Sequence, residues 1–146
     1  MAALSDYLEN KMVDSIFRGQ TFPTIGGLWI ALYTASPSDA GGGTEVSGGS
    51  YARTNLAPSL ANWAGTQASG STGASTGTNG TTSNNSAITF PGPTANWGTV
   101  VAFGIFDAQT GGNLLFWGAL TASKTINSGD AAPSFASGQL SLQIDN

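Results

Sequence analysis

Glycine, proline and asparagine interrupt this chain so often that its apolar residues fall into short runs. The 146 residues include 21 Gly and 6 Pro, and short apolar runs bounded in this way predict strands joined by turns. A chain of this length is sufficient for one domain with a core of its own. We therefore expect residues 1–146 to form a single, mainly β domain: an antiparallel β-sandwich or jelly-roll-like fold with one N-terminal α-helix.

The strand predictions rest on the pattern of apolar side chains. The segment LWIALYT at 28–34 is apolar on both faces, which is typical of a strand buried on both sides. The segment QLSLQID at 139–145 alternates strictly, which predicts a half-buried antiparallel strand. Further strands are expected at 51–56, 87–90, 99–107, 113–120 and, briefly, 124–127. Asp107, Gly111 and Gly112 supply the residue types of a hairpin turn between two of these strands.

The first part of the chain has the period of a helix. Ser5 is the expected N-cap, and Gly19 can take the left-handed conformation that ends a helix over about 5–18. The apolar positions recur three and four residues apart and form a stripe that we expect to pack on the sandwich. They are Leu8, Met12, Val13, Ile16 and Phe17.

Residues 64–86 contain almost only Gly, Ser, Thr, Asn and Ala. Without large apolar side chains, such a segment cannot build a core by itself. It predicts a long surface loop, or an arm that docks on a neighbouring chain, with Asn79 and Gly80 as a candidate tight turn.

The residue types that are missing exclude several kinds of chemistry. The chain has no Cys and no His, so that Ser-His-Asp and Cys-His catalytic systems, zinc sites and disulfides are excluded. Four Lys and Arg and a net charge of −4 do not fit a nucleic-acid-binding groove. No apolar run could span a bilayer, and the N-terminus resembles no signal peptide. We expect no cofactor, no metal and no membrane or nucleic-acid partner.

The low charge content also bears on assembly. Charged residues make up only 8% of the chain, against about 25% in typical soluble proteins. A surface of small neutral polar groups can pack against neighbours without burying unpaired charge. We interpret this as the surface of a subunit in a permanent assembly, with a secreted domain of uncharged surface as the alternative.

The glycine-rich segment SDAGGGTEVSGGSYAR at 38–53 is a candidate ligand loop. A P-loop requires a Lys after its glycines, and a dinucleotide site requires a βαβ unit; the sequence has neither. Asp39 and Glu45 could supply oxygen ligands to Ca²⁺, but the alternating acids of an EF-hand are missing. Solvated acids beside a turn are the preferred interpretation.

Paired carboxylates for glycan hydrolysis are a further alternative. Asp39, Glu45, Asp107 and Asp130 all lie in expected turns, where acidic side chains usually cap the backbone. We therefore expect no enzyme, and an acid-pair glycosidase is kept only as an alternative.

Two of the four tryptophans are candidate interface residues. Trp29 and one of Phe116 and Trp117 lie in apolar strands and are expected in the core. Trp63 and Trp97 have polar, Asn-rich surroundings instead, which favours an interface or ligand contact.

Three long segments resemble a known family. They are SDYLENKMVDSIFRGQ at 5–20, LYTASPSDAGGGTEVSGGSYAR at 32–53 and ANWGTVVAFGIFDAQTGGNLLFWGALTASKTINSGD at 95–130. Together with the final alternating strand they resemble small structural proteins of tailed bacteriophages, commonly labelled tail fibre proteins. The resemblance covers nearly the whole chain except 64–86, which looks like an insertion. It implies a virion component and brings no catalytic residue.

The size of the chain bears on its place in the virion. A compact chain of this length has a radius of gyration of roughly 15 Å, and the sequence has no shaft repeat. Our first hypothesis is a capsid decoration or cement protein, a homo-oligomer such as a trimer that bridges major capsid proteins on the capsid surface. Tyr51 and Arg53 would then be interface anchors. The alternative is a tail fibre or tail-tip component that contacts tail proteins and binds a host surface glycan through Trp63 and Trp97.

Overall fold

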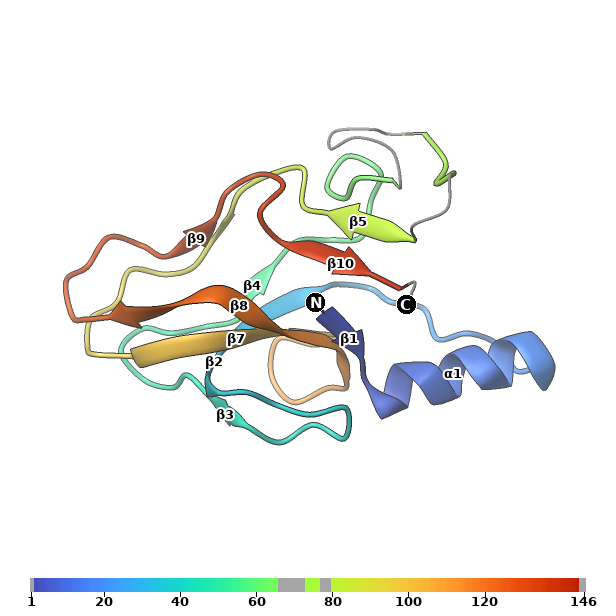
Figure 1. Cartoon of the computed structure of the whole chain (residues 1–146), viewed down its shortest axis with the longest axis horizontal. Coiled ribbons are helices and arrows are strands. Elements are labelled where there is room, and N and C mark those ends of the chain that lie inside the picture. Colours follow the sequence, from blue (N-terminus) through green and yellow to red (C-terminus); the bar gives the residue numbers. More distant parts are fainter. Residues whose placement is uncertain (1, 66–72, 77–79, 145–146) are drawn as a thin grey trace.

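The computed structural model describes residues 2–65, 73–76 and 80–144 (Figure 1). Within these residues, six strands form one antiparallel sheet in the order β1-β8-β7-β2-β3, with β4 also paired to β2. Two two-stranded sheets, β10-β5 and β6-β9, form a second layer. The strands are β1 (Ala2–Leu4), β2 (Trp29–Ala35), β3 (Thr44–Glu45), β4 (Thr54–Asn55), β5 (Thr81–Ser83), β6 (Ile88–Thr89), β7 (Gly98–Phe106), β8 (Leu114–Ile126), β9 (Ser134–Phe135) and β10 (Ser141–Gln143).

The main core lies between these two layers. Ile30 of β2 and Ile105 of β7 belong to the same buried cluster as Ile88 of β6 and Leu142 of β10. Packing of two antiparallel layers around one apolar core is the arrangement of a β-sandwich. The expected mainly β, sandwich-like fold with an N-terminal helix is therefore confirmed.

The other face of the main sheet carries a second, smaller cluster. Its buried members include Ala31 and Tyr33 of β2 and Phe106 of β7. The strand expected at 28–34 is thus buried on both sides, as its sequence predicts. The two-stranded sheets occupy only the first face, so loops must cover this second cluster.

A buried asparagine fixes the second layer. The Asn84 side chain is fully buried, and its Nδ2 donates to the carbonyls of Ser86 (2.8 Å) and Ala136 (2.9 Å). Its Oδ1 accepts from the Leu140 N–H at 2.9 Å. Because these partners lie on different loops, one amide joins the segment after β5 to the segment before β10.

The helix α1 (Asp6–Phe17) begins and ends where the sequence predicts. Ser5 is its N-cap, with the side chain accepting from the Leu8 N–H. The same hydroxyl donates to the carbonyl of Leu114 on β8. Gly19, just beyond the helix, has φ +67°, the left-handed conformation expected at this position.

The packing expected for α1 is wrong in part. Leu8 is buried, but Ile16 is 65% exposed and Phe17 is 79% exposed. Because Ser5 holds only the first turn against β8, the rest of α1 extends beyond the sheet (Figure 1). The apolar stripe therefore faces solvent along most of its length.

No helix among the described residues is long and apolar enough to cross a membrane.

Several strand boundaries differ from the expectations. The strands expected at 113–120 and 124–127 are one strand, β8, whose pairing with β7 shifts register between Val100 and Ala102. Only Thr54–Asn55 of the expected strand at 51–56 pairs, and Leu142 but not Ile144 is buried in the last strand. The short strands β1, β3 and β9 have no counterpart in the predictions.

The low-complexity segment at 64–86 is not a loop throughout. Its residues Thr81–Ser83 form β5 and pair with β10, and Asn84 is the buried side chain described above. The positions 66–72 and 77–79, including the expected turn residue Asn79, lie outside the described residues.

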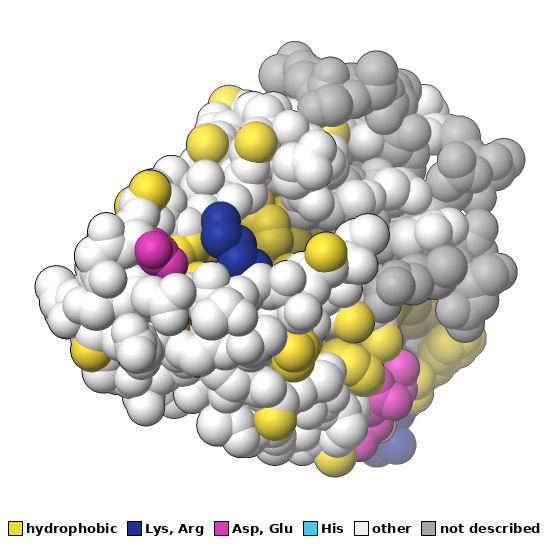
Figure 2. Space-filling model, turned by 60° about the vertical axis from the view of Figure 1, so that its left-hand side comes forward, with side chains coloured by type: hydrophobic (Ala, Val, Ile, Leu, Met, Phe, Trp, Pro, Cys, Tyr) yellow, Lys and Arg dark blue, Asp and Glu magenta, His cyan; other side chains and the backbone are white. Residues whose placement is uncertain are grey.

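Uncharged polar side chains and backbone cover most of the described surface seen in Figure 2. Few charged side chains appear on this face, as the composition predicts. One basic side chain stands over a hollow with hydrophobic side chains at its bottom (Figure 2).

Candidate functional site

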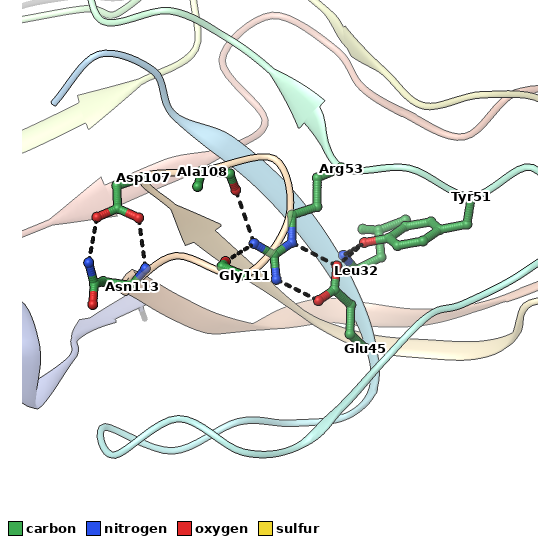
Figure 3. Close-up of polar contacts among 8 residues, drawn as sticks. All are labelled: Leu32, Glu45, Tyr51, Arg53, Asp107, Ala108, Gly111 and Asn113. Carbon is green, nitrogen blue, oxygen red and sulfur yellow. Dashed lines mark hydrogen bonds and ion pairs between the residues drawn. The ribbon is translucent and has the colours of Figure 1, made fainter.

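Arg53 joins three separate segments of the chain (Figure 3). Its Nε donates to Oε1 of Glu45 at 2.9 Å, and its Nη2 donates to Oε2 at 2.8 Å. Its Nη1 donates to the carbonyls of Ala108 (3.0 Å) and Gly111 (2.8 Å) in the β7–β8 turn. The bidentate pair and the two carbonyl bonds together give nearly all N–H donors of the guanidinium an acceptor. We call these four residues the Arg53 clamp.

The clamp lies over the second apolar cluster. The guanidinium carbon of Arg53 is 3.5 Å from the ring centroid of Phe106, and the Arg53 side chain is only 9% exposed. Burial by itself lowers the pKa of Arg53, but the hydrogen bonds and the charge of Glu45 outweigh it and raise the pKa. The group is therefore permanently charged, and the clamp covers apolar surface with a paired ion.

Tyr51 fills a gap beside β2. Its hydroxyl accepts from the Leu32 N–H at 2.9 Å and donates to Oε1 of Glu45 at 3.0 Å. Since β3 and β4 pair with other positions of β2, the phenol satisfies a backbone donor that no neighbouring strand reaches. Burial, foremost, raises the pKa of Tyr51, so the phenol stays protonated and can keep donating to Glu45.

The interface role expected for Tyr51 and Arg53 stays a prediction. Within the chain, both side chains already have structural partners that account for their positions. Tyr51 also contacts the rings of Phe90 and Trp97, with centroids 6.4 Å and 5.3 Å away.

The two candidate tryptophans differ in burial. Trp97 is only 5% exposed, and its Nε1 donates to the Gly49 carbonyl at 2.9 Å. Trp97 is thus buried within the chain, which its polar sequence neighbourhood does not reveal, because the burial comes from distant residues. Its interface role stays a prediction. Trp63 is half-buried, donates to the Leu56 carbonyl, and lines a small apolar pocket of about 210 Å³. Its interface role stays a prediction.

The glycine-rich segment at 38–53 is a turn with close backbone contacts. Gly43 has φ +75°, and a Cβ there would meet the Ala35 carbonyl oxygen at 2.6 Å. Gly49 has φ +53°, and a Cβ there would lie 3.0 Å from Trp97 Nε1. A side chain at either position would therefore meet both an unfavourable φ and a close contact, which glycine avoids.

The acidic side chains considered for metal or catalytic roles have separate partners. Asp39 accepts from Trp117 Nε1 at 2.9 Å, whereas Glu45 belongs to the clamp. Asp107 accepts from the Asn113 N–H and Asp130 from the Asn127 N–H, both at 2.7 Å. Asp107 and Asp130 thus have the turn-capping role that the sequence predicts, whereas Asp39 and Glu45 bond to side chains distant in the sequence. No group of three potential metal ligands occurs among the described residues.

Two of the open surfaces among the described residues have linings that the sequence did not reveal. One is a groove of about 520 Å³ between α1, β1 and the end of β10. The other is a cleft of about 570 Å³ between β8 and β9, lined in part by Lys124 and Phe135. The sequence signal for the cleft is slight: Lys124 is the one basic residue after Arg53, and it stands in a strand of Thr, Ser and Ala.

We expect Arg53→Ala to lower the free energy of unfolding by about 2–4 kcal/mol, since it leaves Glu45 and two carbonyls without their partner. Urea unfolding measures the loss. Arg18→Ala is the matched control, because the Arg18–Asp14 pair has a 71% exposed arginine and should contribute less than about 0.5 kcal/mol. Equal losses in the two variants would show that the clamp does not stabilise the fold.

We expect stability to fall steeply above pH 10. Burial, and secondarily the charge of Glu45, raises the pKa of Tyr33 to about 12, above the value of about 10 in an unfolded chain. This contribution is fully present below pH 10 and is lost as the pH rises through 12, by about 3 kcal/mol for this residue. Urea unfolding between about pH 9 and 12 should show a shallower decline for Tyr33→Phe. Identical declines would exclude Tyr33 as the cause.

In a comparison with protein families, one family model matches nearly the whole chain. The family model Gp80, described as podophage GP4 fiber I protein gp80, matches residues 3–143. The match includes α1, the Arg53 clamp and the residues that line the groove and the cleft, except Ala2 and Ile144 at the two ends. It confirms the resemblance to virion structural proteins of tailed phages. Among curated proteins, no match was found.

Proposed function

Because the chain belongs to the podophage GP4 fiber I protein family, we propose that it is a tail fibre component that binds a glycan on the host surface. Membership of this family makes the chain a structural protein of a phage virion. The observation that carries the proposal is the family match over residues 3–143. Capsid decoration, the first hypothesis from the sequence, has no support in the family description, which favours a fibre.

The open cleft between β8 and β9 supports the glycan part of the proposal. Small-molecule sites are concave and combine apolar walls with a few polar groups, over about 300–1,000 Å³. The cleft has this size, and it joins Phe135 to the polar side chains of Thr121 and Gln139. Sugars present both an apolar ring face and hydroxyl groups, so they fit such a lining.

The exposed face of α1 supports assembly into a homo-oligomer. Met12, Val13, Ile16 and Phe17 line the groove beside β1, and a solvent-exposed phenylalanine leaves on the order of 150 Å² of apolar surface to bury. The fibre component would cover this face with a second copy of itself.

The charges of α1 favour an antiparallel contact between two copies. Asp6 and Glu9 lie in its first turn, and Arg18 is its C-cap. Two antiparallel helices would bring Arg18 of each copy to the acidic end of the other. The antiparallel alignment of the two helix dipoles is also electrostatically favourable. Such a contact has twofold symmetry. The trimer expected from the sequence would require a further surface.

The location of the protein on intact phage particles tests the fibre role. We expect gold-labelled antibody against the chain to mark the tail end of the particle. Purified protein added to host cells should also reduce phage adsorption, and periodate oxidation of the cell-surface glycans should abolish its binding to the cells. Label spread over the head at a copy number near that of the capsid protein would overturn the fibre role in favour of capsid decoration.

The molar mass in solution tests the proposed helix contact. We expect light scattering after size-exclusion chromatography to give a multiple of the 14.7 kDa chain. The double variant Ile16→Ser, Phe17→Ser should give the monomer mass without loss of thermal stability, since both side chains are exposed. Val101→Ser, at a half-buried position on β7 away from the groove, is the control and should keep the oligomer. A wild-type monomer, or an oligomer unchanged by the double variant, would exclude α1 as the contact.

A further inference from the structure

The cleft between β8 and β9 has one wall from each layer of the sandwich. β8 contributes Leu120, Thr121 and Lys124, and the opposite wall contains Phe135 of β9 and Gln139 before β10. The lining of the cleft thus combines the positive charge of Lys124 with apolar side chains such as Leu120 and Phe135.

Lys124 is unlike the other basic residues of this chain. Arg53 pairs with Glu45, Arg18 pairs with Asp14, and Lys11 lies 5.7 Å from the ring centroid of Tyr7. Within the described part of the chain, Lys124 is the one basic side chain with no ion pair, hydrogen bond or ring contact. In a chain with four basic residues, the unpaired one lines this cleft of about 570 Å³. Its charge is complementary to an anionic ligand group.

The floor of the cleft offers an aromatic surface at a fixed orientation. Phe135 is half-buried and contacts Phe90 and Phe103 edge to face, with centroids 6.3 Å and 6.2 Å away. These two rings fix the Phe135 ring, so that it can contact the apolar face of a sugar at little cost in conformational entropy. Neutral donors and acceptors on Thr121, Ser134 and Gln139 surround it.

The edge of β8 does not suit an added peptide strand. Between Ala119 and Lys124, five steps along β8 match only two steps along β7, from Ala102 to Val100. The three extra residues form a bulge, and bulges bend and twist an edge so that it no longer templates a regular ladder. The bulge also places Leu120, Thr121 and Ala122 in the lining of the cleft. A saccharide, which needs no ladder, fits this wall better than a peptide.

We propose that this cleft binds an acidic saccharide, a short oligosaccharide whose sugar rings carry carboxylate groups. Lys124 pairs with a carboxylate, Phe135 contacts a ring face, and the neutral side chains bind hydroxyl groups. The proposal rests on the glycan binding proposed above and specifies its chemical class. A single exposed lysine gives a weak site, which repeated copies on a virion would strengthen through multivalency.

Calorimetric titration of the full chain with trigalacturonate and with its neutral methyl ester tests the proposal. The two ligands have the same rings and differ in the carboxylate charge. We expect the wild type to bind the acid at least about fivefold more tightly than the ester at low salt, and the difference to shrink as salt screens the charge. Lys124→Gln should remove the preference, and Lys124→Arg should retain it. Phe135→Leu should lower the affinity for both ligands.

Lys11→Gln is the matched control, because Lys11 lies on α1 and does not line the cleft. It should bind both ligands like the wild type. Equal affinity for acid and ester, or equal losses in Lys11→Gln and Lys124→Gln, would overturn the role of Lys124. Tighter binding of a hexaglutamate peptide than of trigalacturonate would overturn the saccharide assignment.

The outcome for the cleft is separate from the outcome for the fibre role. Label at the tail end with no detectable binding of trigalacturonate would overturn the acidic saccharide and leave the fibre role standing. Label over the head would overturn the fibre role, whereas the charge preference and its loss in Lys124→Gln would still support the site.

Discussion

The ion pair between Arg53 and Glu45 is the interaction on which one side of this sandwich depends. β2 has apolar side chains on both faces, and the two-stranded sheets cover only one of them. On the other face, polar turns lie over Phe106 and Tyr33, and turns of this composition have little apolar surface to hold them there. The guanidinium supplies directional bonds to the β7–β8 turn and to β3 instead. Such bonds specify one arrangement more sharply than apolar contacts do.

Short-range sequence patterns predicted the helix and the strands that have a capping residue or a regular spacing of apolar residues. Ser5 and Gly19 mark the ends of α1, and the two-faced pattern at 28–34 marks β2. The sequence could not reveal contacts made by distant residues: Trp97 is buried partly by Gly49, 48 positions away. Two-residue strands such as Thr44–Glu45 are too short to show any period. The same limit applies to the cleft, whose walls come from segments that only the fold brings together.

The proposed attachment and recognition surfaces occupy different parts of the molecule. In Figure 1, the C-terminal end of α1 and the strand β9 lie at opposite ends of the view. A fibre component arranged in this way could contact its neighbours through α1 and still present the wall formed by β9 outward. Only 8% of the residues are charged, which keeps long-range repulsion between copies low and permits close packing on a virion.

The bulge in β8 separates the wall of the cleft from the hydrogen-bonded ladder that supports it. On either side of the bulge, Ala119 and Lys124 remain in register with β7, whatever side chains the intervening residues carry. Leu120 packs against the main core, but the exposed positions 121–123 can be altered by natural selection without shifting a strand or exposing the core. Under the glycan binding proposed above, variation in this short segment would change what the particle adheres to and leave the folding of the chain intact.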